Sequence, residues 1–120
     1  MKLYQKTAAE LSAMLRSKEV SALEIAEDTL ARIAAVEPQI DAFLSVDAEG
    51  MLAKAKATDE KMAKGEAVGA LAGVPVAVKD NICTKGQRTT CASKMLENFI
   101  PPYNATVVEK LHSADALIPG

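Results

Sequence analysis

The chain has 120 residues, of which 49% are hydrophobic and 25% charged, with a formal net charge of -2. This length suits one compact domain, and the composition excludes a disordered or collagen-like chain. Its apolar runs are far shorter than the roughly 20 residues that span a bilayer, and residues 1–6 lack the apolar stretch of a secretory signal. A slightly acidic chain without clustered Lys and Arg is also a poor direct binder of nucleic acid. We therefore expect a cytoplasmic protein.

Three places in the chain carry the signature of a helix start, in which Ser or Thr precedes Glu by three residues ahead of an apolar periodic run. They are Thr7 with Glu10, Ser21 with Glu24, and Thr106 with Glu109. Each pair predicts a capping box that satisfies the first free amides of a helix. The first two starts predict a helical pair over residues 7–36, with Pro38 ending the second helix.

A further helix is predicted to begin at Asp47 as its N-cap and to end at Gly65. Its apolar positions include Met51 and Met62, which indicates one buried face. We interpret four lysines on or near its outer faces as solvated, namely Lys54, Lys56, Lys61 and Lys64.

Short runs rich in β-forming residues at 42–46, 74–78 and 116–118 are predicted to be strands. Their alternation with helices predicts an α/β fold in which helices pack on a largely parallel or mixed sheet, with an α/β segment over residues 42–120. The last strand begins as the sequence ends, and Pro119 is poorly suited to a central strand. We therefore expect residues 1–120 to be the N-terminal portion of a longer domain.

The cysteines and the histidine give no support for a metal site. Cys83 and Cys91 stand eight positions apart, and His112 is the only imidazole. These ligands are too few and wrongly spaced for zinc. In a reducing cytoplasm we expect two free thiols, and we expect His112 to have a surface or packing role.

Lys79 is the strongest candidate for chemistry, because it follows the apolar run 74–78 directly and is followed by Asp80 and Asn81. A cation at the carboxyl end of a strand lies where α/β folds gather their binding and catalytic sites. Such an amine could act as a general base when desolvation favours its neutral form, or stay charged and hold an anion. A purely structural lysine, paired with Asp80 or Asp41, is an equally weighted alternative.

The run Val76-Ala77-Val78-Lys79 also fits the strand that carries the phosphate-binding lysine of protein kinases. A kinase needs a G-x-G-x-x-G loop upstream, whereas Gly65, Gly69 and Gly73 are spaced four residues apart. The H-R-D and D-F-G motifs are absent as well, so we reject a kinase.

Three blocks of sequence resemble the amidase signature family. They are G-V-P-V-A-V-K-D-N-I at 73–82, T-T-C-A-S-K-M-L at 89–96 and P-P-Y-N-A-T-V-V at 101–108. The first block is specific for the family, and the other two favour the A subunit of the glutamyl-tRNA(Gln) and aspartyl-tRNA(Asn) amidotransferases. The resemblance covers essentially the whole chain, including the helices ahead of the first predicted strand.

The resemblance implies a Ser, cis-Ser, Lys triad in which Lys79 is the catalytic lysine, with Asp80 and Asn81 as possible supporting residues. The lysine takes a proton through a bridging serine while a second serine attacks an amide carbonyl. In the A subunit the amide is glutamine, and the released ammonia travels to the B subunit, which holds the tRNA. The partners implied are therefore the amidotransferase B and C subunits, with ATP and magnesium on the partner. No cofactor or metal is expected in this chain.

Both serines of the family would lie beyond Gly120, and neither Ser93 nor Ser113 has the Gly-Ser-rich context of a nucleophile. We therefore predict that residues 1–120 alone have no glutaminase activity. Two alternatives stay open: a non-catalytic interaction module, and an amidase that acts on a different amide.

Overall fold

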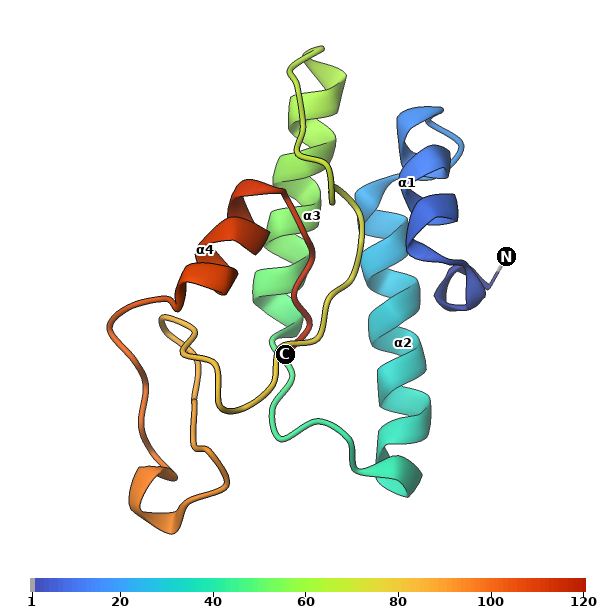
Figure 1. The fold of residues 1–120 in the computed structure, drawn as a ribbon. Coiled ribbons are helices and arrows are strands. Elements are labelled where there is room, and N and C mark those ends of the chain that lie inside the picture. Colours follow the sequence, from blue (N-terminus) through green and yellow to red (C-terminus); the bar gives the residue numbers. More distant parts are fainter. Residues whose placement is uncertain (1) are drawn as a thin grey trace.

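The computed structural model describes residues 2–120 as helices joined by long extended segments (Figure 1). Helices α2 and α3 lie side by side, with α1 next to α2 and α4 next to α3 (Figure 1). The helices are η1 (Leu3–Gln5), α1 (Ala8–Arg16), α2 (Ala22–Ile40), α3 (Ala48–Ala63), η2 (Lys94–Leu96) and α4 (Thr106–Ser113). Within this described range no helix is both long and apolar enough to cross a membrane.

The capping boxes predicted for the first two helices are confirmed. The Thr7 hydroxyl accepts the Glu10 amide at 3.2 Å, and the Glu10 carboxylate accepts the Thr7 amide at 2.7 Å. Ser21 and Glu24 form the same reciprocal pair at 3.1 and 2.7 Å. The local sequence therefore fixes where α1 and α2 begin, because each box satisfies two backbone donors.

The other predicted start signals fared differently. Asp47 caps α3 as predicted, since its carboxylate accepts the Gly50 amide at 3.1 Å. Helix α4 exists, but the prediction that Thr106 caps it was wrong. Ala105 precedes the helix, and its carbonyl accepts the amides of Val108 and Glu109 at 3.0 and 3.1 Å. The first turn thus closes one residue earlier, and Thr106 becomes its first helical residue.

Pro38 does not end α2, contrary to the sequence prediction. The helix continues to Ile40, and Asp41 ends it with a left-handed φ of 54° and an amide that donates to Glu37 at 2.8 Å. Pro38 sits in the last turn, where it removes only one helical donor. The Glu37 carboxylate also accepts the Phe43 amide at 2.7 Å, which holds the chain as it leaves the helix.

The core is formed by the facing sides of α1, α2 and α3 together with the segments that run between them. Its fully buried members are Leu15, Ala22, Ile25, Ala26, Met51, Ala55 and Leu117. Gly73 passes over this core with φ of 76°, and a Cβ there would lie 2.8 Å from Leu15 Cδ2. Only glycine adopts this φ and this close approach to Leu15 without strain. The first residue of the block at 73–82 is therefore required for packing.

Asp59, on α3, caps the start of α2 from outside that helix. Its two carboxylate oxygens accept the Ala22 and Leu23 amides at 2.8 and 3.0 Å. These are the first two amides of α2, which have no partner inside the helix. The carboxylate also lies at the positive end of the helix dipole.

Asp59→Ala is expected to lower the free energy of unfolding by about 1–2 kcal/mol, because it strips both amides of their acceptor. Urea unfolding measures the loss, and faster amide exchange at Ala22 and Leu23 locates it. Glu60→Ala is the matched control, since Glu60 is an exposed neighbour on the same helix. An equal loss in the two variants would rule out the capping role.

The mixed sheet predicted from residues 42–46, 74–78 and 116–118 is not confirmed: residues 2–120 contain no strand. One isolated parallel bridge joins Pro75 and Leu117. Around it Leu117 donates to Val74 at 2.9 Å, and Val76 donates to Leu117 at 2.7 Å. The two segments run alongside each other as parallel strands do, but only for one bridge.

Pro119 explains why the pairing stops. It has no N–H to donate the next ladder bond. Its carbonyl instead accepts the Asp47 amide at 2.7 Å, and Val78 donates to Gly120 at 2.9 Å. The segment around Pro119 is therefore held between residues 74–78 and the start of α3 without a regular ladder.

The prediction that Lys54 is solvated was wrong, since its side chain is 29% exposed, whereas Lys56 and Lys64 are exposed and the Lys61 side chain is 44% exposed, as predicted. Lys54 Nζ lies 2.9 Å from Asp115 Oδ1, and Lys61 Nζ lies 3.6 Å from the same oxygen. Asp115 follows α4 in the sequence and its side chain is only 7% exposed. Two cations of α3 thus meet a buried carboxylate.

Candidate active site

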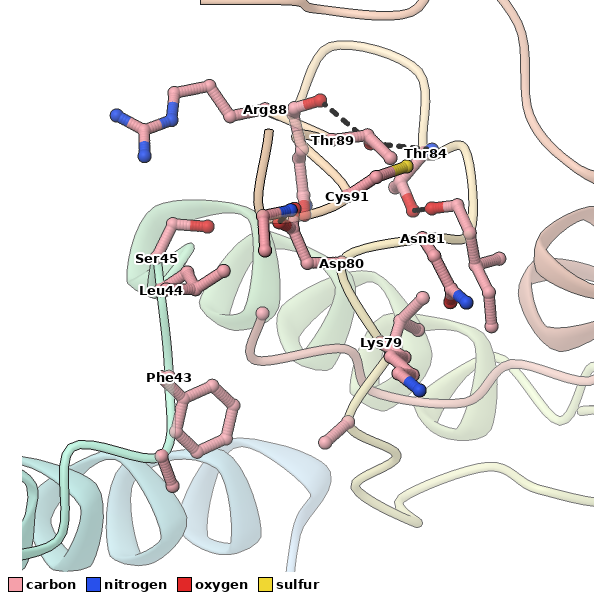
Figure 2. Close-up of a pocket in the computed structure, with 17 residues that line it drawn as sticks. Phe43, Leu44, Ser45, Lys79, Asp80, Asn81, Thr84, Arg88, Thr89 and Cys91 are labelled. Atoms are coloured by element: carbon pink, nitrogen blue, oxygen red, sulfur yellow. Dashed lines mark hydrogen bonds between the residues drawn. The ribbon is translucent and has the colours of Figure 1, made fainter. Parts of the chain in front are cut away.

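A cavity of about 740 Å³ lies beside Lys79 (Figure 2). Three segments form its walls: 42–45 after α2, the stretch 77–82 that carries Lys79, and the loop 84–92, with Gly120 beside them. Hydrogen bonds from Val76 and Val78 to residues 117 and 120 hold the chain just before Lys79. The cavity therefore lies at the end of the segment that was predicted to present the lysine.

Lys79 lies on this cavity with its side chain exposed. Among residues 2–120, only Lys54 and Lys61 form ion pairs, both with Asp115, so Lys79 pairs with neither Asp80 nor Asp41. Figure 2 shows the Lys79 side chain on the opposite side of the chain from Asp80. A structural ion pair therefore does not account for Lys79, which is exposed and lines the cavity.

Asp80 binds the loop that follows it. Its carboxylate accepts the Thr90 amide at 2.8 Å, the Thr90 hydroxyl and, at 3.4 Å, the Ala92 amide. Its backbone carbonyl accepts the Cys91 amide at 2.9 Å. Burial alone raises the pKa of Asp80, but the hydrogen bonds from Thr90 and Ala92 outweigh it, so this pKa lies below its ordinary value. The side chain is an anion fixed by donors of one short loop.

The loop bound by Asp80 has an unusual backbone. Cys91 and Ala92 have φ values of 52° and 57°, both in the left-handed region. For residues with a Cβ this conformation costs about 1–2 kcal/mol each. Both residues line the cavity. A strained turn therefore forms one of its walls.

Segment 42–45 and Gly120 form the wall facing this loop. Phe43 and Ser45 line the cavity, and a Cβ on Gly120 would lie 2.3 Å from the Ser45 carbonyl oxygen. The backbones approach so closely there that only glycine fits. Asp47 joins the start of α3 to the loop 84–92, since its second carboxylate oxygen accepts the Gln87 side-chain amide at 2.9 Å.

The other residues singled out in the sequence lie as follows. Asn81 is exposed and lines the cavity near Lys79 (Figure 2). Ser93 caps η2 by accepting the Met95 amide at 3.2 Å, which gives it a structural role. Ser113 ends α4, and neither serine lines the cavity.

Cys83 and Cys91 are free thiols, and His112 is exposed on α4. Cys83 Sγ lies 3.4 Å from the Tyr103 hydroxyl. Within the described part of the chain, no group of three or more His, Cys, Asp or Glu side chains could hold a metal ion. The cavity therefore offers the Lys79 amine, the anchored Asp80 carboxylate and the Arg88 guanidinium, together with uncharged polar side chains such as those of Ser45, Asn81 and Cys91.

Sequence reasoning missed the role of Thr90 and Ala92 as partners of Asp80, and it missed Phe43 as a wall of the cavity. No local pattern pointed to Thr90 and Ala92, because they lie ten and twelve residues after Asp80. No local pattern pointed to Phe43 either, which tertiary packing brings to the cavity.

The chain belongs to the Amidase family, whose profile its residues 24–120 match. Among its relatives, the A subunit of the glutamyl-tRNA(Gln) amidotransferase of Carboxydothermus hydrogenoformans is 55% identical over 120 residues, which cover 100% of this chain and 25% of the relative. The chain thus spans about a quarter of the length of the curated relatives it matches.

Solved structures give the same family. A bacterial aryl acylamidase of the amidase signature family superposes with a TM-score of 0.89 at 29% identity, covering 96% of this chain and 24% of that one. The peptide amidase of Stenotrophomonas maltophilia also has a TM-score of 0.89, at 28% identity, covering 97% of this chain and 24% of its own. The fold of this chain is therefore that of a segment of the amidase signature enzymes.

Proposed function

We propose that this chain is the N-terminal portion of the A subunit of a tRNA-dependent amidotransferase, in which Lys79 is the catalytic lysine of a glutamine-hydrolysing site. The observation that carries the proposal is the placement of Lys79. It lies on a cavity of about 740 Å³, forms no ion pair among the described residues, and follows a segment anchored to the core.

The chemistry proposed for Lys79 is proton transfer. A neutral amine takes the proton of a bridging serine, which takes that of a nucleophilic serine as this attacks the glutamine amide carbonyl. The proton then leaves with ammonia, and water hydrolyses the acyl-enzyme to glutamate. Both serines lie outside this chain in the proposal, so residues 1–120 supply the base and part of the cavity wall.

The identity of the relatives favours glutamine over other amides. The Carboxydothermus hydrogenoformans relative is 55% identical, whereas the aryl acylamidase and the peptide amidase are 29% and 28% identical. An amide hydrolase of another specificity is the second candidate. A non-catalytic interaction module is the third, and the unpaired Lys79 on a cavity argues against it.

In this proposal the A subunit works in the cytoplasm with the B and C subunits of the amidotransferase. The chain has a net charge of -2, which suits a subunit that passes ammonia on and leaves tRNA, ATP and magnesium to the B subunit. The ammonia then converts Glu-tRNA(Gln) to Gln-tRNA(Gln) on that partner.

A transplant tests the proposal. The 120-residue segment of the Carboxydothermus relative that aligns with this chain is replaced by it, and the hybrid is assembled with that enzyme's other subunits. We expect glutamine hydrolysis within about tenfold of the parent, since one lost contact of about 1.4 kcal/mol costs a factor of ten. The isolated chain is expected to hydrolyse no glutamine.

A folded hybrid without glutaminase activity would refute the proposal, and so would glutaminase activity in the isolated chain. The coding sequence after Gly120 gives an independent check. A Gly-Ser-rich block with two suitably spaced serines is expected there, and its absence would favour an interaction module.

A further inference from the structure

Asp80 makes contacts that the proposed catalytic role of Lys79 does not explain. Four hydrogen bonds join it to three consecutive residues, Thr90, Cys91 and Ala92. Asp80 also follows Lys79 directly in the chain, so its position is fixed by the same anchored segment. The loop is thereby tied to the backbone that presents the amine.

The turn at residues 91–92 needs such an anchor. Two successive non-glycine residues in the left-handed region persist only where their surroundings hold them. Beyond the bonds to Asp80, the turn is closed by the Ser93 amide, which donates to the Thr90 carbonyl at 2.8 Å, and by the Ala92 amide on the Thr90 hydroxyl at 3.2 Å. Since Asp80 also binds that hydroxyl, it is the common partner of the turn.

Cys91 and Ala92 line the cavity together with segment 42–45. We propose that Asp80 is a positioning residue: it holds the 90–92 turn as a rigid cavity wall and so determines how tightly the amide substrate binds. The identity of the substrate in this inference rests on the proposed function. The contacts between Asp80 and the 90–92 turn do not depend on it.

The effect on catalysis should fall on binding. The turn contacts the cavity, while the backbone of Lys79 is anchored separately through residues 76–78 and 117–120. A loosened wall weakens binding of the substrate and the transition state alike, which raises KM and leaves kcat nearly unchanged. A merely structural residue would instead lower the fraction of folded enzyme and leave KM alone.

The test is Asp80→Asn in the full-length subunit, assembled with its partners. The amide nitrogen of the introduced asparagine would face backbone and hydroxyl donors, so at least one charged hydrogen bond is lost. We expect a KM for glutamine about tenfold higher, with kcat within about threefold of the parent. Amide exchange at Cys91 and Ala92 should accelerate about tenfold or more, whether or not the enzyme turns over glutamine.

Glu97→Gln is the matched control, because Glu97 is an exposed carboxylate of the neighbouring segment, and it should change neither quantity. Unchanged exchange at Cys91 and Ala92 in Asp80→Asn would overturn the inference even if no glutaminase activity is found. Faster exchange with an unchanged KM would overturn it too. By contrast, an absence of glutamine turnover in the parent and in every variant, with faster exchange in Asp80→Asn, would refute the proposed substrate and leave the role in the turn supported.

Thr90→Val is a milder second variant in case Asp80→Asn does not fold. It removes only the Thr90 hydroxyl and keeps the backbone hydrogen bonds to Asp80. It should raise KM by about threefold, while Thr90→Ser should restore the parent value. Equal KM values for Thr90→Val and Thr90→Ser would overturn the inference.

Discussion

Lys79→Ala is expected to lower kcat for glutamine hydrolysis by about 10³-fold in the full-length subunit, because the variant has no amine to take the serine proton and general-base catalysis contributes about 10²–10⁴. KM should change little, since the lysine acts on the reacting proton more than on ground-state binding. The measurement is steady-state glutaminase kinetics with the partner subunits present.

Two further variants sharpen this result. Lys79→Arg should be as inactive as Lys79→Ala, because a guanidinium keeps its charge and cannot serve as a base. Lys85→Ala is the matched control, since Lys85 is exposed, lies six positions further on and does not line the cavity. Glutamine turnover that survives Lys79→Ala would remove Lys79 from the mechanism.

Three of the four predicted helix starts, which depend on neighbouring residues, were correct, and the start at Thr106 was the exception. The caps at Thr7, Ser21 and Asp47 depend on residues three positions away, and all three are present. Lys79 was found because a whole block of sequence resembles one family, and the family is confirmed. Its catalytic role stays a prediction.

Features that depend on distant residues were not predictable. Asp59 caps a helix that begins 37 residues earlier, and Asp115 pairs with Lys54 across 61 residues. No local pattern encodes these contacts, so Lys54 was interpreted as solvated. The predicted strands failed for a related reason: apolar β-rich runs indicate extended buried backbone, but a ladder also needs partners with free amides, which Pro119 lacks.

In the candidate site, too, the local feature was predicted and the contact between distant residues was not. The sequence predicted a lysine at the end of an extended segment, and the structure places Lys79 there, beside a cavity. It suggested Asp80 as a partner of that lysine, whereas Asp80 binds residues 90–92. Sequence distance alone could not choose between a neighbouring cation and a loop ten residues away, because either would satisfy a carboxylate.

The largest effect on stability is expected at Asp115. Its Oδ1 lies 2.9 Å from Lys54 Nζ, and its Oδ2 accepts the Gly69 amide at 2.7 Å. Asp115→Asn should lower the free energy of unfolding by about 2 kcal/mol, because it removes the buried carboxylate that binds Lys54, whose own side chain is 29% exposed. The backbone at this position has a left-handed φ of 62°, which asparagine adopts readily. The variant therefore removes the charge without straining the backbone.

The pH dependence of this loss follows from the pKa of Asp115. Burial alone raises that pKa, but the hydrogen bonds from Lys54 and Gly69, with the charges of Lys54 and Lys61, outweigh it and place it below the ordinary 3.8. A lowered folded-state pKa means that the ion pair contributes fully above the unfolded-state value. The contribution is lost as the pH falls through the lower, folded-state value.

Urea unfolding of the parent and of Asp115→Asn from pH 7 to pH 2 should therefore show a gap that is constant at neutral pH and closes below about pH 4. Replacing both partners, as in Lys54→Met with Asp115→Asn, should cost less than the sum of the single changes, because the interaction that the two side chains share is lost only once. Additive losses would mean that the pair is not coupled. A gap of the same size at pH 2 would mean that packing, and not the charge of Asp115, joins α3 to the segment after α4.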